Sequence, residues 1–473
     1  MYNLEGKTLA ISPLVIRDVL QGIAFSSKDK SIFIECSDSS DFKINRNKFI
    51  QKTIDQAKLI IGYSLLSEFE FTKFRSIKPL FYNMNPEIRL KNLKDIMKVS
   101  EDYSRPDKFL VIGENYKKSL EYQKQVSNCV KESQFIYGYY FNNRELYKND
   151  LVKLDNKLLK LLSQKSVIEI DKVESKTLSI MYLSKQWELE HKLWGIIGYP
   201  FNYLNELDKN ISSNRDVVDL YNDVNELKNR YQGISDYIDC DSVKIQLDPL
   251  GSSTGRIVCR DQFGVFTPAN YHRNIFKSKK DYTFLEFDYK HQEATIIANI
   301  TKDPKLITLL ENDTLYTNIA KLAKIKCENT RDIGKNLFFS IVYGAQVNSL
   351  ESRFNIDKTQ LDKVYNYIQE NFPKTYKYMG LKFKTNIFGR ELHSNNFNSL
   401  IQSTAADIVK HKLVELDIIP SIVFSDALVF EIPDEDIVTK VKRIKSKLTS
   451  PINSIGDTSP LIVKISKNKT LKF

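Results

Sequence analysis

The sequence predicts a multidomain protein that combines α/β and α+β architecture. The chain has 473 residues, 42% of them hydrophobic, which is enough material for a large core and corresponds to roughly two to four domains. Residues 1–148 alternate short apolar runs with polar turns, a pattern typical of a small α/β domain. Leucines at three- and four-residue spacing then predict helices within 151–165, and residues 216–232 repeat that pattern. From Asp248 onwards, strands, glycine turns and helices are mixed.

The charge balance favours a polyanionic partner without requiring one. Lys and Arg total 70 against 59 Asp and Glu, a formal net charge of +11. Nucleic acid is the commonest partner of a basic chain of this size. A Lys-rich surface that serves only solubility explains the same charge equally well.

The cysteines and the N-terminal segment indicate a reducing compartment. The five cysteines are scattered without a C-x-x-C pair, which argues against a disulfide framework or a zinc site. No basic segment followed by an apolar one opens the chain, and no apolar run approaches the roughly 18–20 residues that cross a bilayer. We therefore expect an intracellular, cytoplasmic protein without a membrane partner.

Two acids stand at the ends of predicted strands. Asp288 closes the apolar strand Thr283–Phe287, and Asp426 lies at the tip of a hairpin formed by Ser421–Phe424 and Leu428–Ile432. A carboxylate there is costly unless something positive faces it. If the two acids converge, their hard oxygen ligands suit magnesium. For either strand alone, a solvated turn acid is the simpler interpretation.

Residues 330–345 predict a helix with one distinctive face. Thr330 suits its N-cap, Asp332 its first turn and Gly344 its end. Such a face offers two cations for a triphosphate and two rings for a base and its sugar, although an ordinary amphipathic helix has the same spacing. Four side chains recur at every fourth position and stay within roughly 120° of the helix surface: Arg331, Lys335, Phe339 and Tyr343.

Taken together, these segments resemble the motifs of family A DNA polymerases, the DNA polymerase I type. The helix resembles motif B, R-x3-K-x3-F-x3-Y-G, while Asp288-Tyr289 with Glu293 resembles motif A, D-Y-S-Q-I-E. Asp426 resembles the acid of motif C, V-H-D-E. Residues 253–268 resemble the segment TGRLSS…DPNLQNIP, and residues 398–410 resemble N-x3-Q-G-T-A-A-D-I-I-K. All five segments stand in the family's order.

The resemblance implies a right-hand polymerase that extends a primer 5′→3′ with two Mg²⁺ ions, for which Mn²⁺ can substitute. Asp288 and Asp426 would bind the metals with help from the Tyr289 carbonyl. Glu293 would exclude a 2′-hydroxyl. The remaining dNTP-binding residues would be Arg331, Lys335, Phe339, Tyr343 and Tyr316, and the DNA-binding residues would be Arg256, Thr254, Asn398 and Gln402.

The same resemblance implies a domain order and a set of partners. The partners would be primer–template DNA and dNTPs, and the chain would act as a monomer. The expected divisions are an exonuclease-like domain at 1–148, a helical thumb at 149–247, the palm at 248–300 with motif A, the fingers at 301–397, and the rest of the palm at 398–473.

Several positions depart from the family pattern. Ser425 and Ala427 replace the His and Glu beside the motif C acid, and Lys290-His291 replaces Ser-Gln in motif A. Tyr316 stands where bacterial enzymes carry His. These changes spare both metal acids and the whole helix face.

The N-terminal domain resembles a 3′→5′ exonuclease only in outline. Alignment with that fold places Lys7, Leu9 and Val126 at three of the four expected acids and leaves Glu68 as one survivor. An exonuclease of this kind needs about four carboxylates for two metals, so the sequence predicts a domain without proofreading. A shifted alignment, with Asp38, Asp41, Glu68 or Glu70 as the acids, is the alternative.

Two other functions remain open from the sequence. A single-subunit RNA polymerase shares the acids and a similar helix, but Phe339 and Glu293 favour deoxynucleotides. A catalytically inactive primer–template binder is suggested by the altered neighbours of Asp426.

Overall fold

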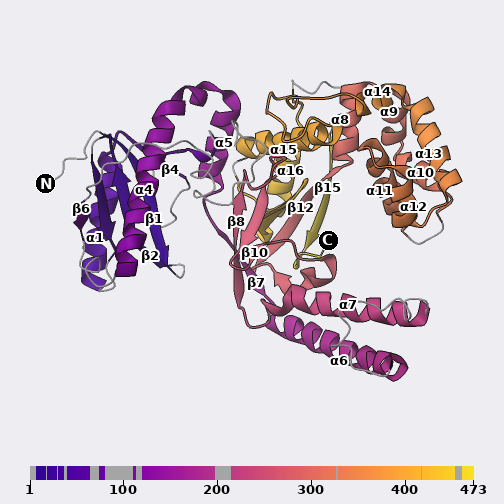
Figure 1. The fold of residues 1–473 in the computed structure, drawn as a ribbon, viewed down its shortest axis with the longest axis horizontal. Coiled ribbons are helices and arrows are strands. Elements are labelled where there is room, and N and C mark those ends of the chain that lie inside the picture. Colours follow the sequence, from indigo (N-terminus) through magenta and orange to yellow (C-terminus); the bar gives the residue numbers. More distant parts are fainter. Residues whose placement is uncertain are drawn as a thin grey trace.

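The computed structural model describes most of the chain and arranges it as separate lobes around central sheets (Figure 1). A small sheet domain lies at one end, a helical lobe at the other, and a two-helix arm projects below the centre. The described residues are 7–16, 19–28, 30–36, 40–63, 74–79, 110–112, 120–197, 215–325, 329–416, 418–452 and 461–472.

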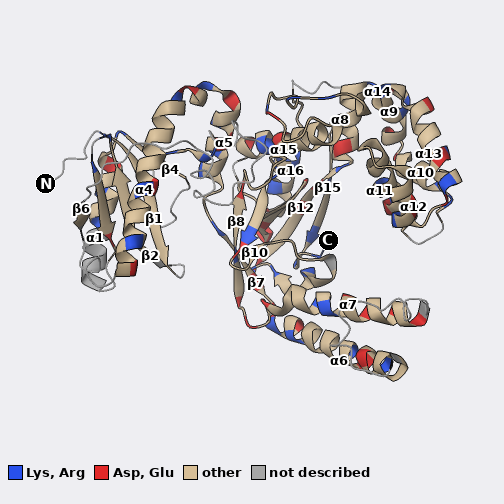
Figure 2. Ribbon diagram, in the orientation of Figure 1, with Lys and Arg blue, Asp and Glu red and all other residues tan. Residues whose placement is uncertain are grey.

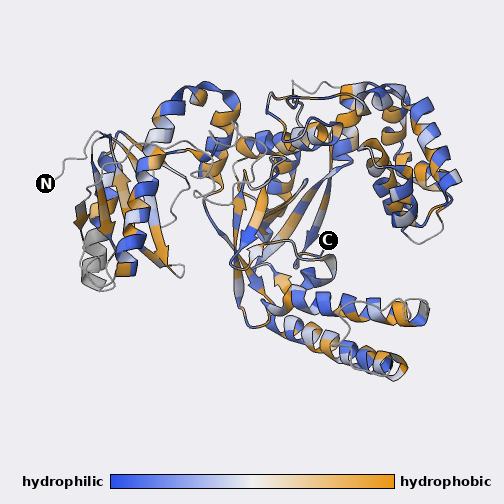
Figure 3. Cartoon of the chain, in the orientation of Figure 1, coloured by the Kyte–Doolittle hydropathy of each residue, from blue (hydrophilic) through white to orange (hydrophobic). Residues whose placement is uncertain are grey.

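The N-terminal lobe is a six-stranded sheet with helices against it. The strand order is β5-β4-β1-β2-β3-β6, with β2 antiparallel to both neighbours and the outer pairs parallel. Figure 3 shows hydrophobic residues along these strands, which is why the sheet buries its faces. Its elements are β1 (Thr8–Ile16), β2 (Val19–Ser26), β3 (Ser31–Glu35), α1 (Ser40–Gln56), β4 (Leu59–Gly62), β5 (Phe74–Ser76), β6 (Leu110–Ile112) and α4 (Leu120–Asn143).

The next segment begins as a helix but is not wholly helical. Asn149 caps α5 (Asp150–Leu161) by accepting a hydrogen bond from the Leu151 N–H at 2.8 Å. Two strands, β7 (Ser166–Ile170) and β8 (Ser242–Asp248), then enclose the arm helices α6 (Lys172–Ile197) and α7 (Arg215–Ser235). The expectation of a helical region at 149–247 is therefore wrong for β7 and β8, whose apolar residues alternate with exposed ones.

Two central sheets share one hydrophobic core. The first has the order β10-β9-β8-β7-β11 and the second the order β13-β14-β12-β15, with every pair antiparallel. Besides β7 and β8, the first sheet contains β9 (Val258–Asp261), β10 (Gly264–Val265) and β11 (Phe276–Lys277). The short helix η4 (Asn270–Ile275) directly precedes β11. The second contains β12 (Tyr282–Lys290), β13 (Ile422–Phe424), β14 (Ala427–Pro433) and β15 (Ile462–Asn468), with α15 (Phe397–Glu415) and α16 (Ile437–Thr449) against it.

The helical lobe has a hydrophobic core of its own. It joins the central sheet where β12 passes into α8, and α15 packs against α8. No described helix is both long and apolar enough to cross a membrane. The helices are α8 (Gln292–Thr301), α9 (Pro304–Glu311), α10 (Leu315–Leu322), α11 (Thr330–Val342), α12 (Val347–Phe354), α13 (Lys358–Asn371) and α14 (Pro373–Met379).

A buried group of charges ties α5 to α15. Arg390 lies between two carboxylates, with 2.8 Å from its Nη1 to Asp155 Oδ2 and 2.7 Å from its Nη2 to Asp407 Oδ1. Lys410 lies 3.3 Å from Asp155, so two cations balance two anions. All four side chains are at most 2% exposed. Removing one member would leave a buried charge uncompensated, which is strongly destabilising.

Candidate active site

The two acids singled out by the sequence lie next to each other in the second central sheet. Asp288 is the seventh residue of β12 and pairs with Ala427, the first residue of β14. Phe424 also pairs with Ala427, so the turn is the two residues Ser425 and Asp426, one fewer than expected. Ser425 has φ 59°, a left-handed conformation that few residues other than glycine adopt.

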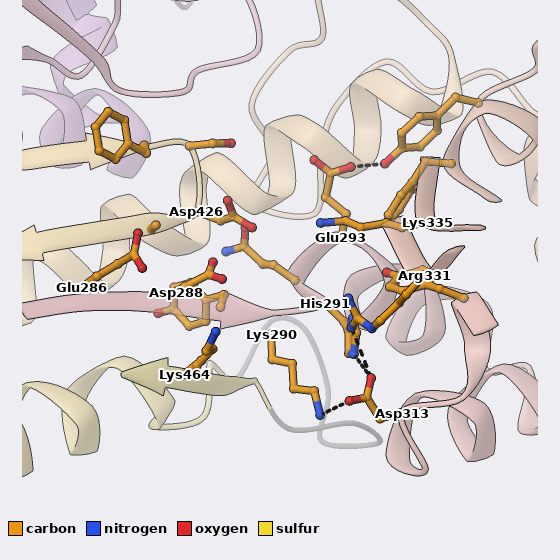
Figure 4. A pocket seen from close by; sticks show the side chains of 18 of the residues that line it. Glu286, Asp288, Lys290, His291, Glu293, Asp313, Arg331, Lys335, Asp426 and Lys464 are labelled. Carbon is orange, nitrogen blue, oxygen red and sulfur yellow. Dashed lines mark hydrogen bonds and ion pairs between the residues drawn. The ribbon is translucent and has the colours of Figure 1, made fainter. Parts of the chain in front are cut away.

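Both acids face a cleft of about 1040 Å³ between the sheet and the helical lobe (Figure 4). The sheet contributes the carboxylates Asp288 and Glu286 together with Lys464, and α11 contributes two cations and an aromatic ring from the opposite side. Its lining residues are Arg273, Glu286, Asp288, Tyr289, Lys290, His291, Gln292, Glu293, Asp313, Tyr316, Arg331, Lys335, Phe339, Tyr343, Phe424, Ser425, Asp426, Ala427 and Lys464.

The carboxylates are crowded and partly removed from water. Burial, followed by the charge of Asp288, raises the pKa of Asp426 to about 6. Burial also raises the pKa of Asp288, against the opposing effects of Lys335 and Lys464. Glu286 stands two residues before Asp288, on the same face of β12, and burial together with Asp288 raises its pKa as well. Added positive charge would relieve this repulsion.

The donor set at this point suits a divalent cation with hard oxygen ligands. Two strand-end carboxylates leave coordination positions for water and phosphate oxygens, as magnesium requires. Among the described residues, no three or more His, Cys, Asp and Glu side chains form a metal-holding group. The Tyr289 ring is 2% exposed and its hydroxyl donates to the Leu448 carbonyl at 3.0 Å, so only the Tyr289 main chain can reach the cleft.

The four side chains of the predicted helix face all line the cleft from α11. The helix begins after Asn329 rather than after the expected Thr330, which is its first residue, and no side chain caps it. It ends as expected: Gly344 has φ 90°, and its N–H and that of Ala345 donate to Ile341 and Ser340, both at 2.9 Å.

A glycine holds α11 close to α10. A Cβ on Gly334 would lie 2.2 Å from the Tyr316 carbonyl oxygen, so no larger residue fits there without moving one of the helices. Tyr316 itself is 2% exposed and lines the cleft, and its hydroxyl has no hydrogen-bond partner within the described chain. The Arg331 guanidinium lies over its ring at 5.4 Å.

Glu293 is fixed at the centre of the cleft. It accepts hydrogen bonds from the Tyr343 hydroxyl and from Arg256, which also forms an ion pair with it. Burial, and then the charge of Glu293, raises the pKa of Tyr343 well above its ordinary value. The Phe339 and Tyr343 rings stack at 5.6 Å with 29° between their planes. The stacked rings of Phe339 and Tyr343 therefore line one side of the cleft, next to the Glu293 carboxylate.

The other residues assigned to DNA lie outside this cleft. Asn398 and Gln402 are one turn apart on α15 and are partly exposed among buried neighbours. Thr254 lies in the turn before β9, with its hydroxyl 3.4 Å from that of Ser252. Only Arg256 reaches a cleft residue, through Glu293. The contacts of all four with DNA stay a prediction.

The sequence did not single out Asp313, whose carboxylate contacts basic side chains from both the sheet and the helical lobe. Asp313, between α9 and α10, lies 2.9 Å from Lys290, 2.8 Å from His291 and 3.3 Å from Arg331. Partial burial raises the pKa of Asp313, but the hydrogen bonds from these three side chains outweigh that effect and lower the pKa to about 2. No periodicity connects residues 290, 313 and 331, so only the fold brings them together. Lys464 was missed because only the fold brings it to the cleft, whereas Glu286, two residues before Asp288, could have been found from the two-residue repeat of a strand.

The positions assigned to exonuclease acids are largely apolar core. Leu9 and Val126 are both 0% exposed and pack into the hydrophobic clusters of the N-terminal lobe, while Lys7 is exposed. Asp38, Glu68 and Glu70 lie outside the described residues, as does the side chain of Asp41. The absence of proofreading therefore stays a prediction.

Comparison with known proteins shows similarity to DNA polymerases. The family described as DNA polymerase family A matches residues 198–387. DNA polymerase I of Caldicellulosiruptor bescii is 25% identical over 264 residues, which cover 46% of this chain and 30% of that protein. DNA polymerase I of Bacillus subtilis is 24% identical over 379 residues, which cover 62% of this chain and 43% of that protein. The chain thus spans less than half the length of these two relatives.

A solved structure shares the fold. It is described as the POL domain of Pol1 from M. smegmatis in complex with DNA primer-template and dNTP, and it superimposes with a TM-score of 0.71 over 99% of this chain and 96% of that one, at 13% identity. The family match covers the β12 acid and the cation face of α11, and the shared fold extends beyond it to the hairpin of Asp426. Residues 198–387 thus match DNA polymerase family A, and nearly the whole chain shares the fold of that POL domain.

Proposed function

We propose that the protein is a DNA-directed DNA polymerase that adds dNTPs to a primer 3′-hydroxyl, without proofreading. One observation carries this proposal: the cleft sets Asp288 and Asp426 across from Arg331 and Lys335. Phosphoryl transfer depends mainly on positioning and charge neutralisation, for which such an arrangement suffices.

Each side chain of the cleft has a role in this proposal. Asp288 and Asp426 would hold magnesium ions, which, when bound, activate the 3′-hydroxyl and stabilise the leaving pyrophosphate. Arg331 and Lys335 bind the triphosphate. The stacked rings of Phe339 and Tyr343 give the sugar and base a flat surface. Glu293, fixed by its two partners, occupies the space that a 2′-hydroxyl needs.

The remaining parts of the chain would bind the primer–template. Arg256, Thr254, Asn398 and Gln402 would contact the duplex.

The arm helices α6 and α7 carry both signs of charge (Figure 2), with paired residues such as Lys192–Glu188 and Arg230–Glu226, so they offer no uniformly basic surface. We propose the division into lobes at 148, 247, 300 and 397, with the chain acting as a monomer.

The test is primer extension on a DNA template in Mg²⁺, with dNTPs and rNTPs in parallel reactions. We expect extension with dNTPs, because Glu293 excludes the 2′-hydroxyl, and little with rNTPs. Equal use of rNTPs would identify an RNA polymerase-like enzyme. Binding of the primer–template without extension would identify an inactive binding protein.

A further inference from the structure

Three basic side chains from separate elements converge on one carboxylate at the edge of the cleft. Lys290 ends β12, His291 precedes α8, and Arg331 lies in the first turn of α11. All three contact Asp313, at 2.9, 2.8 and 3.3 Å respectively (Figure 4). Asp313 thus connects the sheet to the helical lobe.

The corner around Asp313 has more positive than negative charge. Lys290 and Arg331 face the single Asp313 carboxylate, and Lys335 follows Arg331 one turn further along α11. The other cleft acids are occupied elsewhere, since Glu293 is bound by Arg256 and Tyr343 and the remaining carboxylates lie on the sheet. Asp332 lies 4.0 Å from Arg331 but is 71% exposed, so water screens its charge.

Asp313 is placed where it can be displaced. Its side chain is 42% exposed, and it belongs to the short connection between Glu311, the end of α9, and Leu315, the start of α10. It adopts a left-handed conformation with φ 55°. Withdrawal of its carboxylate would break no helix, because the turn is held by main-chain bonds such as Thr314 N–H to Leu309 at 2.9 Å.

We propose that Lys290, His291 and Arg331 form a subsite for the terminal phosphates of the incoming nucleotide, and that Asp313 is a resident carboxylate which those phosphates displace. The proposal rests on the proposed function, since it assigns further residues to the same cleft. Arg and Lys donors arranged for a carboxylate also suit phosphate oxygens, which carry more charge. His291 adds one N–H donor from a side chain that is only 9% exposed.

Displacement makes Asp313 a competitor of the triphosphate. Removing its charge while keeping its shape, as in Asp313→Asn, therefore strengthens phosphate binding. Removing a cation of the subsite, as in Lys290→Ser, weakens it. A carboxylate that merely positions the cations would give the opposite result for Asp313→Asn, because disordered cations bind phosphate less well.

The test is a calorimetric titration of the full chain with inorganic tripolyphosphate, without divalent metal or DNA. We expect Asp313→Asn to bind about three- to tenfold more tightly than the wild type, and Lys290→Ser to bind more weakly by a similar factor. Asp332→Asn is the matched control, because it removes a neighbouring charge outside the cluster, and its affinity should change less than about twofold.

Unchanged or weaker binding by Asp313→Asn would overturn the proposal, as would the absence of tripolyphosphate binding by the wild type. If Asp313→Asn does not fold, which its melting curve would show, Lys290→Ser decides alone: unchanged binding overturns the subsite and weaker binding supports it. Primer extension separates this result from the proposed function. Extension without tighter binding refutes only the subsite, and tighter binding without extension refutes only the polymerase activity.

Discussion

The N-terminal sheet and the sheet that carries the acids are built from similar strands but present different chemistry. In the acid-bearing sheet, Asp288 and Asp426 face a cleft lined with cations. In the N-terminal lobe, the positions where the family resemblance expects acids hold Leu9 on β1 and Val126 on α4, both fully buried in apolar clusters. The two regions thus differ in what surrounds the expected acid positions: charged groups in the cleft and apolar side chains in the N-terminal lobe.

The surroundings of Asp288 and Val126 explain why a carboxylate is tolerated at the first position and not at the second. In the cleft, Lys335 and Lys464 oppose the effect of burial on Asp288. Around Val126, the neighbours are residues such as Leu14, Phe33 and Val130, none of which can compensate a charge. An isolated carboxylate there would lose its hydration without gaining a partner.

The largest expected effect is on catalysis at the acid-bearing sheet. Asp288→Asn or Asp426→Asn should lower the primer-extension rate by about three orders of magnitude or more, since losing a metal ligand costs several kcal/mol and about 1.4 kcal/mol is tenfold in rate. Single-turnover extension measures the loss, and a gel-shift assay should show unchanged primer–template binding. Asp281→Asn, at the exposed start of the same strand, is the control and should extend normally. Wild-type rates from either cleft variant would refute the assigned role of that acid.

The next effect concerns stability in the N-terminal lobe. Val126→Asp places a carboxylate on the face of α4 that packs into an apolar cluster, and it should destabilise this lobe by about 3 kcal/mol or more. Urea unfolding followed by limited proteolysis of the lobe measures this. Asn128→Asp adds the same charge at an exposed position of the same helix and should change stability by less than about 0.5 kcal/mol. Equal tolerance of both substitutions would mean that position 126 can be solvated.

Residues whose positions follow a local pattern in the sequence could be predicted. The four-residue spacing predicted that Arg331, Lys335, Phe339 and Tyr343 share one helix face, and all four line the cleft. Two apolar runs indicated the hairpin of Asp426, whereas its pairing beside the strand of Asp288 was only a possibility from the sequence.

The residues that act through tertiary contact could not be predicted. Asp313 meets Lys290, at the end of β12, and Arg331, on α11, through the tertiary fold, and the sequence carries no sign of that approach. Thr330 was expected as the N-cap from its residue type, but the helix starts one residue earlier in register, after Asn329. Strands β7 and β8 were overlooked because long helices separate the two partners in the chain.

A smaller effect concerns the pH dependence of stability at the acid-bearing sheet. The pKa of Asp426 is raised from 3.8 to about 6 in the folded protein, so the folded state binds more protons than the unfolded state between these values. Stability from this group is complete below about pH 4 and is lost as pH rises through about 6. Asp426→Asn should therefore melt a few degrees above the wild type at pH 8 in EDTA and at the same temperature near pH 4.

Mg²⁺ provides the control for that measurement. If the folded acid pair binds the ion as proposed, Mg²⁺ should raise the melting temperature of the wild type at pH 8 and leave Asp426→Asn nearly unchanged. A variant that melts lower than the wild type at pH 8 without metal would show that Asp426 is already neutralised by its protein neighbours.

The smallest expected effect is an absence of 3′→5′ cleavage by the N-terminal lobe. Metal-dependent hydrolysis needs clustered carboxylates that hold two ions about 4 Å apart, and Leu9 and Val126 are core residues that cannot serve. A 3′-mismatched, end-labelled primer incubated with Mg²⁺ and no dNTPs should therefore keep its length with both the wild type and Glu68→Ala. Asp288→Asn serves as a control, since shortening that survives in it cannot come from the polymerase cleft. Progressive shortening by the wild type and by Asp288→Asn, lost in Glu68→Ala, would place an active exonuclease in the lobe and remove the contrast between the two sheets.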